Sequence, residues 1–294
     1  MSLKPFIFSI AFFATACISK IELVQTPIVF NPVVGNEVRS TDMSVPFPED
    51  KTFGVWASGN KPVGTFIADK EICCTDGVWS SESLPFWPSN SSLTFLAYSP
   101  YGLPMQLEDG NLVMKGFDVH KNDTEVLFAK TPSGLTSEQG EVKLPFTHAL
   151  SKLDVRVANR FGSEIDLRID RIALKGVAMR GDFNSSRHPY WKVDESTLED
   201  VMIFDSERDG QFLAGTTMQF IGGVHAVIPQ GLEPYFEIVY AFRVDEGEWI
   251  DGQQESVQLR GVYWEPGRYY TYSLGINEEK VSYTTGIGHW NGRK

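Results

Sequence analysis

The sequence has no long apolar run, few positive charges and few cysteines, and each absence excludes a class of protein. No stretch of roughly 18 or more apolar residues occurs, so an ordinary membrane-spanning helix is not expected. Lysine and arginine number 26 against 38 aspartates and glutamates, and this net charge of −12 argues against nucleic acid as a partner. The 3 cysteines cannot provide the disulfide framework of a small secreted domain, so packed cores must hold the chain together.

The sequence also lacks the motifs of common catalytic and metal centres. Its 5 histidines share no metal-ligand spacing, and neither HExxH nor GxSxG occurs. The acidic segment from Asp205 to Gly210 resembles the start of an EF-hand loop, but Thr216 stands where a bidentate glutamate is needed. Because its flanks look like strands, we interpret this segment as a hairpin loop. We therefore expect no catalytic residue, no metal, no cofactor and no enzymatic activity.

The first 17 residues, MSLKPFIFSIAFFATAC, have the organisation of a secretory signal peptide. Lys4 supplies the positive charge, residues 6–14 are apolar, and small residues follow. The box Ala14-Thr15-Ala16-Cys17 resembles the cleavage site of bacterial lipoproteins, although these prefer leucine where Ala14 stands. The resemblance implies that residues 1–16 are removed and that Cys17 is acylated, which anchors the chain in a membrane. The alternative is ordinary cleavage that leaves Cys17 as a free thiol.

The other two cysteines, Cys73 and Cys74, are adjacent in the sequence. Neighbouring cysteines rarely form a disulfide with each other, because the bond requires a larger separation of the Cα atoms in relaxed geometry. They also lack the CxxC spacing and the nearby histidine of a zinc site. We expect both to be structural.

From Ile28 onward the sequence alternates between apolar and polar residues and is punctuated by turns such as Asp109-Gly110 and Pro266-Gly267. This period of two is typical of antiparallel strands with one buried face. No convincing amphipathic helix occurs, and the aromatic content of 13% suits strands. The sequence therefore predicts an all-β protein. The clearest alternating runs are residues 153–157, 165–169, 236–244 and 270–276.

The length of 294 residues suggests two domains. The stretch from Thr131 to Glu141 is polar and aperiodic, so the boundary is expected there or just beyond it. We assign residues 1–16 to the signal peptide, 17–145 to an N-terminal and 146–294 to a C-terminal β-sandwich domain. Residues expected at the opening of the second core are Phe146, Leu150, Leu153, Val155 and Val157.

Several short stretches together are similar to the fimbrillin (type V pilin-like, Mfa-like) family of the Bacteroides group. They begin with FGVW at Phe53 and occur in the same order along the chain as in the family. Each stretch alone is weak evidence, and the combination behind a lipoprotein box is strong. The others are residues 87–100 (WPSNSSLTFLAYSP), 146–155 (FTHALSKLDV), 226–230 (AVIPQ), 264–274 (WEPGRYYTYSL) and 287–290 (IGHW).

The resemblance implies two tandem antiparallel β-sandwich domains of the transthyretin-like, Greek-key type. It further implies a lipoprotein of the cell outer membrane that forms part of a fimbrium and serves adhesion and biofilm formation. The implied partners are other fimbrial subunits, in a homo- or hetero-polymer, outer-membrane lipid through Cys17, and a host protein or glycan. The residues after Cys17 lack a dense acidic export motif, so surface exposure and periplasmic retention both stay open.

The segment Thr26 to Val34 (TPIVFNPVV) is apolar and β-prone, and Pro27 and Pro32 suit it to the edge of a sheet. In the family, an arginine-specific protease cuts after a following loop arginine, the first strand is lost, and a strand from a neighbouring subunit replaces it. By position, Arg39 and Ser40 match that cleavage site. The alternative is that Arg39 is an ordinary solvated loop residue.

A competing hypothesis is a surface lipoprotein that binds glycan through exposed aromatic side chains. Stacking on a sugar requires an exposed ring with polar neighbours. Each candidate ring has core packing as its alternative role. The candidates are Trp79, Trp87, Trp191 and Trp249.

Overall fold

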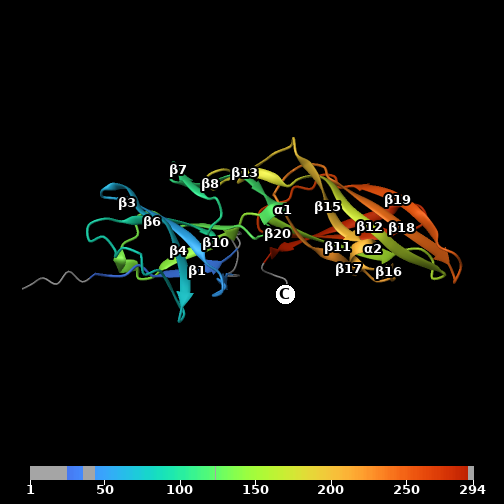
Figure 1. Cartoon of the computed structure of the whole chain (residues 1–294), viewed down its shortest axis with the longest axis horizontal. Helices are drawn as coiled ribbons and strands as arrows, with labels where there is room; N and C mark the ends of the chain where they lie inside the picture. The colour runs from blue at the N-terminus through green and yellow to red at the C-terminus, as the bar shows by residue number, and fades with distance from the viewer. Residues whose placement is uncertain (1–24, 36–43, 123, 291–294) are drawn as a thin grey trace, which may run out of the picture.

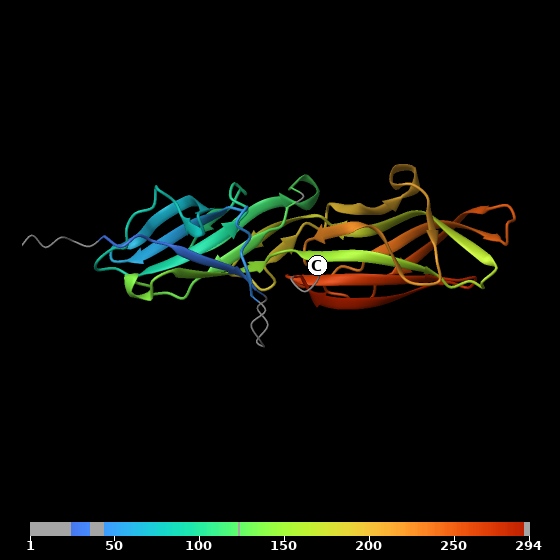
Figure 2. The same cartoon turned by 90° about the horizontal axis from the view of Figure 1, so that it is seen from below.

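The computed structural model describes residues 25–35, 44–122 and 124–290 and shows an elongated molecule built almost wholly of strands (Figures 1 and 2). The helical elements are single turns, namely α1 (Val119–Asn122), α2 (Ser206–Asp209) and a 3-10 turn (Ser137–Gln139). The prediction of an all-β protein is confirmed. Among the described residues, no helix has the length and apolar character needed to span a membrane.

The N-terminal part, residues 25–148, is built around one eight-stranded sheet. Strand β10 stands at one end of the strand order and β1 near the other, and these two strands also pair with each other. In sheet order the strands are β10 (Val142–His148), β9 (Leu127–Lys130), β6 (Leu93–Ser99), β3 (Phe53–Asn60), β4 (Val63–Thr75), β5 (Val78–Ser80), β1 (Phe30–Val34) and β2 (Val45–Pro46).

The remaining strands form three further sheets. One joins the two parts of the chain and contains β14 (Trp191–Val193), β13 (Arg180–Asn184), β8 (Asn111–Asp118) and β7 (Gln106–Glu108). The second contains β17 (Gln219–Val227), β11 (Ser151–Asn159), β20 (Arg268–Ile276) and β21 (Val281–His289). The third contains β15 (Leu198–Asp205), β12 (Ile165–Ala178), β18 (Tyr235–Val244) and β19 (Ile250–Gln258), and β16 (Phe212–Ala214) also pairs with β12.

Strands β3, β6 and β9 are buried on both faces, and their side chains enter two different cores. In β6, Phe95 and Ala97 belong to a first core inside the eight-stranded sheet. The alternate residues Leu96 and Tyr98 belong to a second core that continues into the rest of the molecule. This explains the FGVW stretch, because a Cβ at Gly54 would lie 2.1 Å from the ring of Tyr98, so only glycine leaves room for that ring.

The second core extends through the sheets of the C-terminal part, residues 149–290. Leu150, Leu153, Val155 and Val157 are all buried in it, as expected. The expectation for Phe146 is wrong, because this ring packs in the first core. Alternation predicts the face of a strand but not the core toward which that face points. The domain boundary at residue 145/146 stays a prediction.

Two aromatic side chains connect the sheets across the second core. The ring of Tyr272 in β20 lies 5.3 Å from that of Phe236 in β18, edge to face. The hydroxyl of Tyr272 accepts a hydrogen bond of 2.8 Å from the indole N–H of Trp264, which is 2% exposed. Burial raises the pKa of Tyr272, so its hydroxyl stays protonated. The WEPGRYYTYSL stretch therefore supplies two polar side chains, Trp264 and Tyr272, that are hydrogen-bonded to each other inside the core.

The segment from Asp205 to Gly210 is not the hairpin loop that the sequence favoured. Its flanking strands β15 and β16 both pair with β12 rather than with each other. Asp205 caps the short helix α2 by accepting a hydrogen bond from the Glu207 N–H. Hydrogen bonds from Arg208 lower the pKa of Asp209 to about 2. The acidic side chains of this segment therefore stabilise the helical turn α2.

Val155 provides a test of the second core. Its side chain is 0% exposed, and β11 lies between β17 and β20. Replacing Val155 by aspartate should lower the free energy of unfolding by at least ~3 kcal/mol, because it buries an unpaired charge. Thr284→Asp in the exposed part of β21 is the control. Urea and thermal unfolding measure both, and an unchanged midpoint for Val155→Asp would contradict this packing.

Candidate functional site

The residues assigned to processing and lipidation, Cys17, Arg39 and Ser40, lie outside the described residues and stay predictions. The strand that precedes Arg39 is described. It runs along the N-terminal part toward the middle of the molecule, and the chain resumes at Ser44 after the undescribed residues (Figure 2).

Strand β1 supplies alternate side chains to the first core. Phe30, Pro32 and Val34 are buried, whereas Asn31 is exposed. The ring of Phe30 makes edge-to-face contacts with Phe53 at 5.8 Å and with Phe95 at 5.7 Å between centroids. Fully burying an apolar side chain contributes about 1.5–3 kcal/mol, so this short strand is a substantial part of the core.

Hydrogen bonds hold β1 along its whole length against β10. The two strands are parallel, with Phe30 opposite Val142 and Val34 opposite Phe146. The ladder is extended at both ends, where the Val142 N–H donates to the Val29 carbonyl at 2.8 Å and the Gly35 N–H donates to the Phe146 carbonyl at 3.0 Å. Without β1, the inner edge of β10 and the buried side chains behind it would form an open apolar groove.

The expectation that β1 lies at the edge of a sheet is wrong, because β1 is paired on both sides. Its second side pairs with β5 at Phe30 and with the two residues of β2 at Val33 and Val34. The Phe47 N–H also donates to the Pro32 carbonyl at 3.3 Å. Strand β2 folds back because Phe47 is buried, with its ring 5.3 Å from that of Trp79.

The groove ends at a polar cluster where the two parts of the chain meet. The ring of His148, at the end of β10, stacks on Trp290 with centroids 4.3 Å apart and planes at 12°. The Lys152 ammonium lies 4.0 Å from the centroid of the same indole. A carboxylate oxygen of Glu125 lies 3.4 Å from both His148 Nδ1 and Lys152 Nζ. The FTHAL and IGHW stretches therefore contact one another directly.

This cluster controls the charge of Glu125. Burial alone would raise the pKa of its carboxyl, but the hydrogen bond from His148 and the charges of His148 and Lys152 outweigh burial and lower it. The sequence analysis missed Glu125 and Lys152, since neither lies in a recognisable spacing with its partners. Only the resemblance of the stretches around His148 and Trp290 could have directed attention to this region.

The tryptophans proposed to bind glycan are mostly core residues. Trp79, Trp87 and Trp191 are at most 8% exposed, so a sugar cannot stack on their rings. The fourth, Trp249, is half-buried with the guanidinium groups of Arg168 and Arg243 each 4.8 Å from its ring. Two guanidinium groups therefore already contact this ring.

Cysteines and metal-ligating side chains form no further site within the described ranges. Cys73 and Cys74 are free thiols in β4, and Cys74 packs against the first core. No group of three or more His, Cys, Asp or Glu side chains that could hold a metal ion occurs there.

Comparison with known proteins gives a consistent result. A family model described as fimbrillin-like matches residues 39–290. No curated protein shows significant similarity to the chain. A fimbrial protein from Bacteroides vulgatus has a similar structure, with a TM-score of 0.63 and 13% identity over 89% of this chain and 99% of that one. A putative cell adhesion protein from Bacteroides ovatus has a TM-score of 0.57 and 16% identity over 90% and 98%. At these identities the likeness shows the fold.

The cluster at Glu125 predicts a pH dependence of stability. Because folding lowers the pKa of Glu125 below its ordinary value of 4.5, the interaction is fully present above about pH 4.5 and is lost as the pH falls through the folded pKa. Glu125→Gln should cost about 1 kcal/mol near neutral pH, as for a partly exposed ion pair, and progressively less in acid.

Urea unfolding between pH 3 and pH 7 measures this difference, with Glu108→Gln in β7 as a control for an exposed carboxylate. A Glu125→Gln deficit that stays constant across the range would contradict the assignment.

Proposed function

The chain belongs to the fimbrillin-like family, and from this premise we propose that it is a subunit of a cell-surface fimbrium that serves adhesion and biofilm formation. Its role is structural, with no catalytic step. The observation that carries the proposal is the fit of β1 over an aromatic groove beside β10. A strand that completes a core from the start of the chain can be exchanged for one from another molecule.

We propose that subunits assemble by donor-strand addition at this groove. Removal of β1 would expose Phe53, Phe95 and the inner face of β10, together with unpaired backbone groups of β10. Water satisfies the backbone groups but not the aromatic rings, so a donated extended strand with apolar residues at alternate positions would stabilise the groove again.

The position of Arg39 suits this exchange. Four residues separate β1 from Arg39, and β2 follows Arg39 in the chain, so a cut at Arg39 would separate β1 from β2. Phe47 would then remain in the first core as part of the groove.

We further propose that the chain is a lipoprotein of the outer membrane, anchored through Cys17. The support for this is the order of positive, apolar and small residues directly before Cys17. An acyl anchor would hold the first subunit, or each subunit before assembly, at the membrane surface.

Lipidation predicts a specific chemical label. Cells fed a clickable palmitate should label the wild-type chain, whose mass should also show loss of residues 1–16. Cys17→Ser should not be labelled, because it has no thiol to acylate. Cys73→Ser is the matched control and should be labelled as strongly as the wild type. Equal label on Cys17→Ser would refute the anchor.

Cleavage at Arg39 predicts association. The soluble chain from Ser19, treated with an arginine-specific protease, should give a product that begins at Ser40 and forms higher oligomers as β1 is exchanged. Arg39→Lys keeps the charge but removes the cleavage site, so it should stay monomeric. N-terminal sequencing and mass photometry measure both. Resistance at Arg39, or a cut chain that stays monomeric with its first strand bound, would overturn the mechanism.

A further inference from the structure

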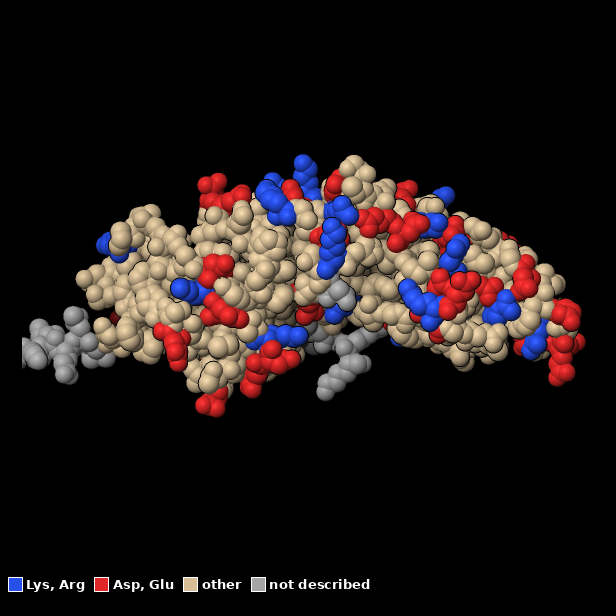
Figure 3. Space-filling model, in the orientation of Figure 1, with Lys and Arg blue, Asp and Glu red and all other residues tan. Residues whose placement is uncertain are grey.

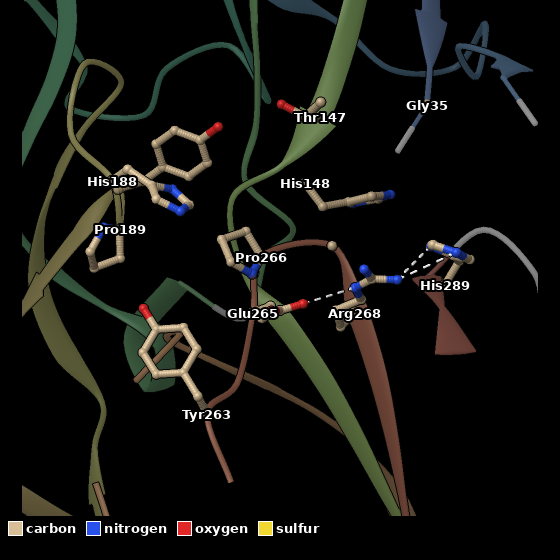
Figure 4. A pocket seen from close by; sticks show the side chains of 12 residues that line it. Gly35, Thr147, His148, His188, Pro189, Tyr263, Glu265, Pro266, Arg268 and His289 are labelled. Atoms are coloured by element: carbon tan, nitrogen blue, oxygen red, sulfur yellow. Dashed lines mark hydrogen bonds and ion pairs between the residues drawn. The ribbon is translucent and has the colours of Figure 1, made fainter. Parts of the chain in front are cut away.

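The junction between the two parts holds a cavity of about 440 Å³, which borders the end of the assembly groove at Gly35, Thr147 and His148 (Figure 4). This volume lies within the range of small-molecule sites, about 300–1,000 Å³. Aromatic and proline side chains form one end of the lining, and a carboxylate, a guanidinium and an imidazole form the other. The residues that matter below are Tyr190, Tyr263, Glu265, Pro266, Arg268 and His289.

The wall formed by residues 263–268 is rigidly held from behind. The side chains of Tyr263 and Glu265 face outward, and that of Trp264 between them is buried. The backbone N–H of Trp264 donates a hydrogen bond of 3.0 Å to the Gln230 carbonyl. The hydroxyl of Tyr270 accepts from the Glu265 N–H at 2.8 Å and donates to the Tyr263 carbonyl at 2.9 Å. The Ser151 hydroxyl donates to the Glu265 carbonyl at 2.8 Å. The outward side chains are thus presented on a fixed backbone, as a preorganised binding site requires.

The opposite wall is also supported. The ring of Tyr190 packs edge to face against Phe128, with centroids 4.8 Å apart, and its carbonyl accepts a hydrogen bond of 2.8 Å from the Asn184 N–H. The neighbouring ring of His188 lies at the same end of the cavity (Figure 4). A ligand in the cavity would therefore contact aromatic rings on two walls, those of Tyr190 and His188 on one and that of Tyr263 on the other.

The polar end of the cavity is close to electrically neutral. The Arg268 guanidinium pairs with the Glu265 carboxylate at 3.2 Å. Its Nη1 also lies 3.1 Å from Nδ1 and 3.4 Å from Nε2 of His289. One negative and one positive charge therefore cancel, while free lone pairs and N–H groups remain for a ligand. Such a site favours a neutral ligand with many hydroxyl groups over an anion.

We propose that this cavity binds a terminal sugar unit of a neutral glycan. The apolar face of a pyranose would lie on the exposed ring of Tyr263 and on Pro266, and its hydroxyls would reach Glu265 and Arg268. This inference rests on the proposed adhesive role and gives it a ligand class and a place. It also replaces the tryptophans as the basis for glycan binding, because Tyr263 is 42% exposed.

Gly231 offers a way to move the key ring without deleting it. A Cβ at this position would lie 2.9 Å from Cδ2 of the Tyr263 ring, so Gly231→Ala must turn the ring away from its present place. Tyr263→Ala removes the ring altogether. Both changes affect an exposed side chain, so the fold should survive, which a melting temperature checks.

The experiment is a glycan array followed by calorimetric titration of the purified chain. The array carries oligosaccharides that end in neutral hexoses or N-acetylhexosamines, together with sialylated and sulfated counterparts. We expect binding to neutral glycans, weakened about three- to tenfold by Tyr263→Ala, as for loss of an aromatic contact. Gly231→Ala should weaken it as well, and Tyr101→Ala, an exposed tyrosine outside the cavity, should leave it unchanged.

Three results would overturn the inference: no binding to any glycan, binding only to the anionic set, or binding that both cavity variants leave unchanged. Capture of a protein partner without any glycan binding would also count against it. If protease-induced assembly occurs as proposed while glycans fail to bind, the cavity is wrong and the fimbrial role stands. If both fail, the proposed function is overturned too.

Discussion

The stacking of His148 on Trp290 is the contact on which the relation between the two cores depends. Phe146 faces the first core and Leu150 the second, so the chain crosses from one to the other within a few residues. The crossing places a buried imidazole between two apolar regions, and the indole from the end of β21 covers it. Glu125 and Lys152 then provide charges beside a ring that could not be buried alone at low cost.

The first core imposes a second constraint, because one of its walls comes from the beginning of the described chain and the others come much later. The ring of Phe30 meets Phe53 and Phe95, and β1 pairs with β10 more than a hundred residues away in the sequence. The core is complete only when these distant segments meet.

The C-terminal sheets carry charged side chains on their outer face, visible over β12, β18 and β19 in Figure 3. Exposed pairs of this kind contribute little to stability, so apolar packing dominates in both parts.

Local alternation predicted the strands well, since a period of two depends only on neighbouring residues. The runs from Leu153, Ile165, Phe236 and Tyr270 all lie in strands. The pairing of those strands, the assignment of Phe146 and the turn after Asp205 depended on contacts between distant segments, which alternation does not encode. The cavity illustrates the same limit. Tyr190 lies in the loop before β14 and Tyr263 in the loop before β20, more than seventy residues apart in the sequence, so only the folded chain brings them together.

The parallel pairing of β1 with β10 has a mechanical consequence. In a parallel pair, the start of one strand and the end of the other lie at opposite ends of the ladder. Tension between the start of β1 and the C-terminal part, which follows β10, therefore pulls the two strands past each other along their length. All hydrogen bonds of the ladder are then loaded at once rather than one after another. A subunit stretched along its long axis resists extension at this ladder by shear.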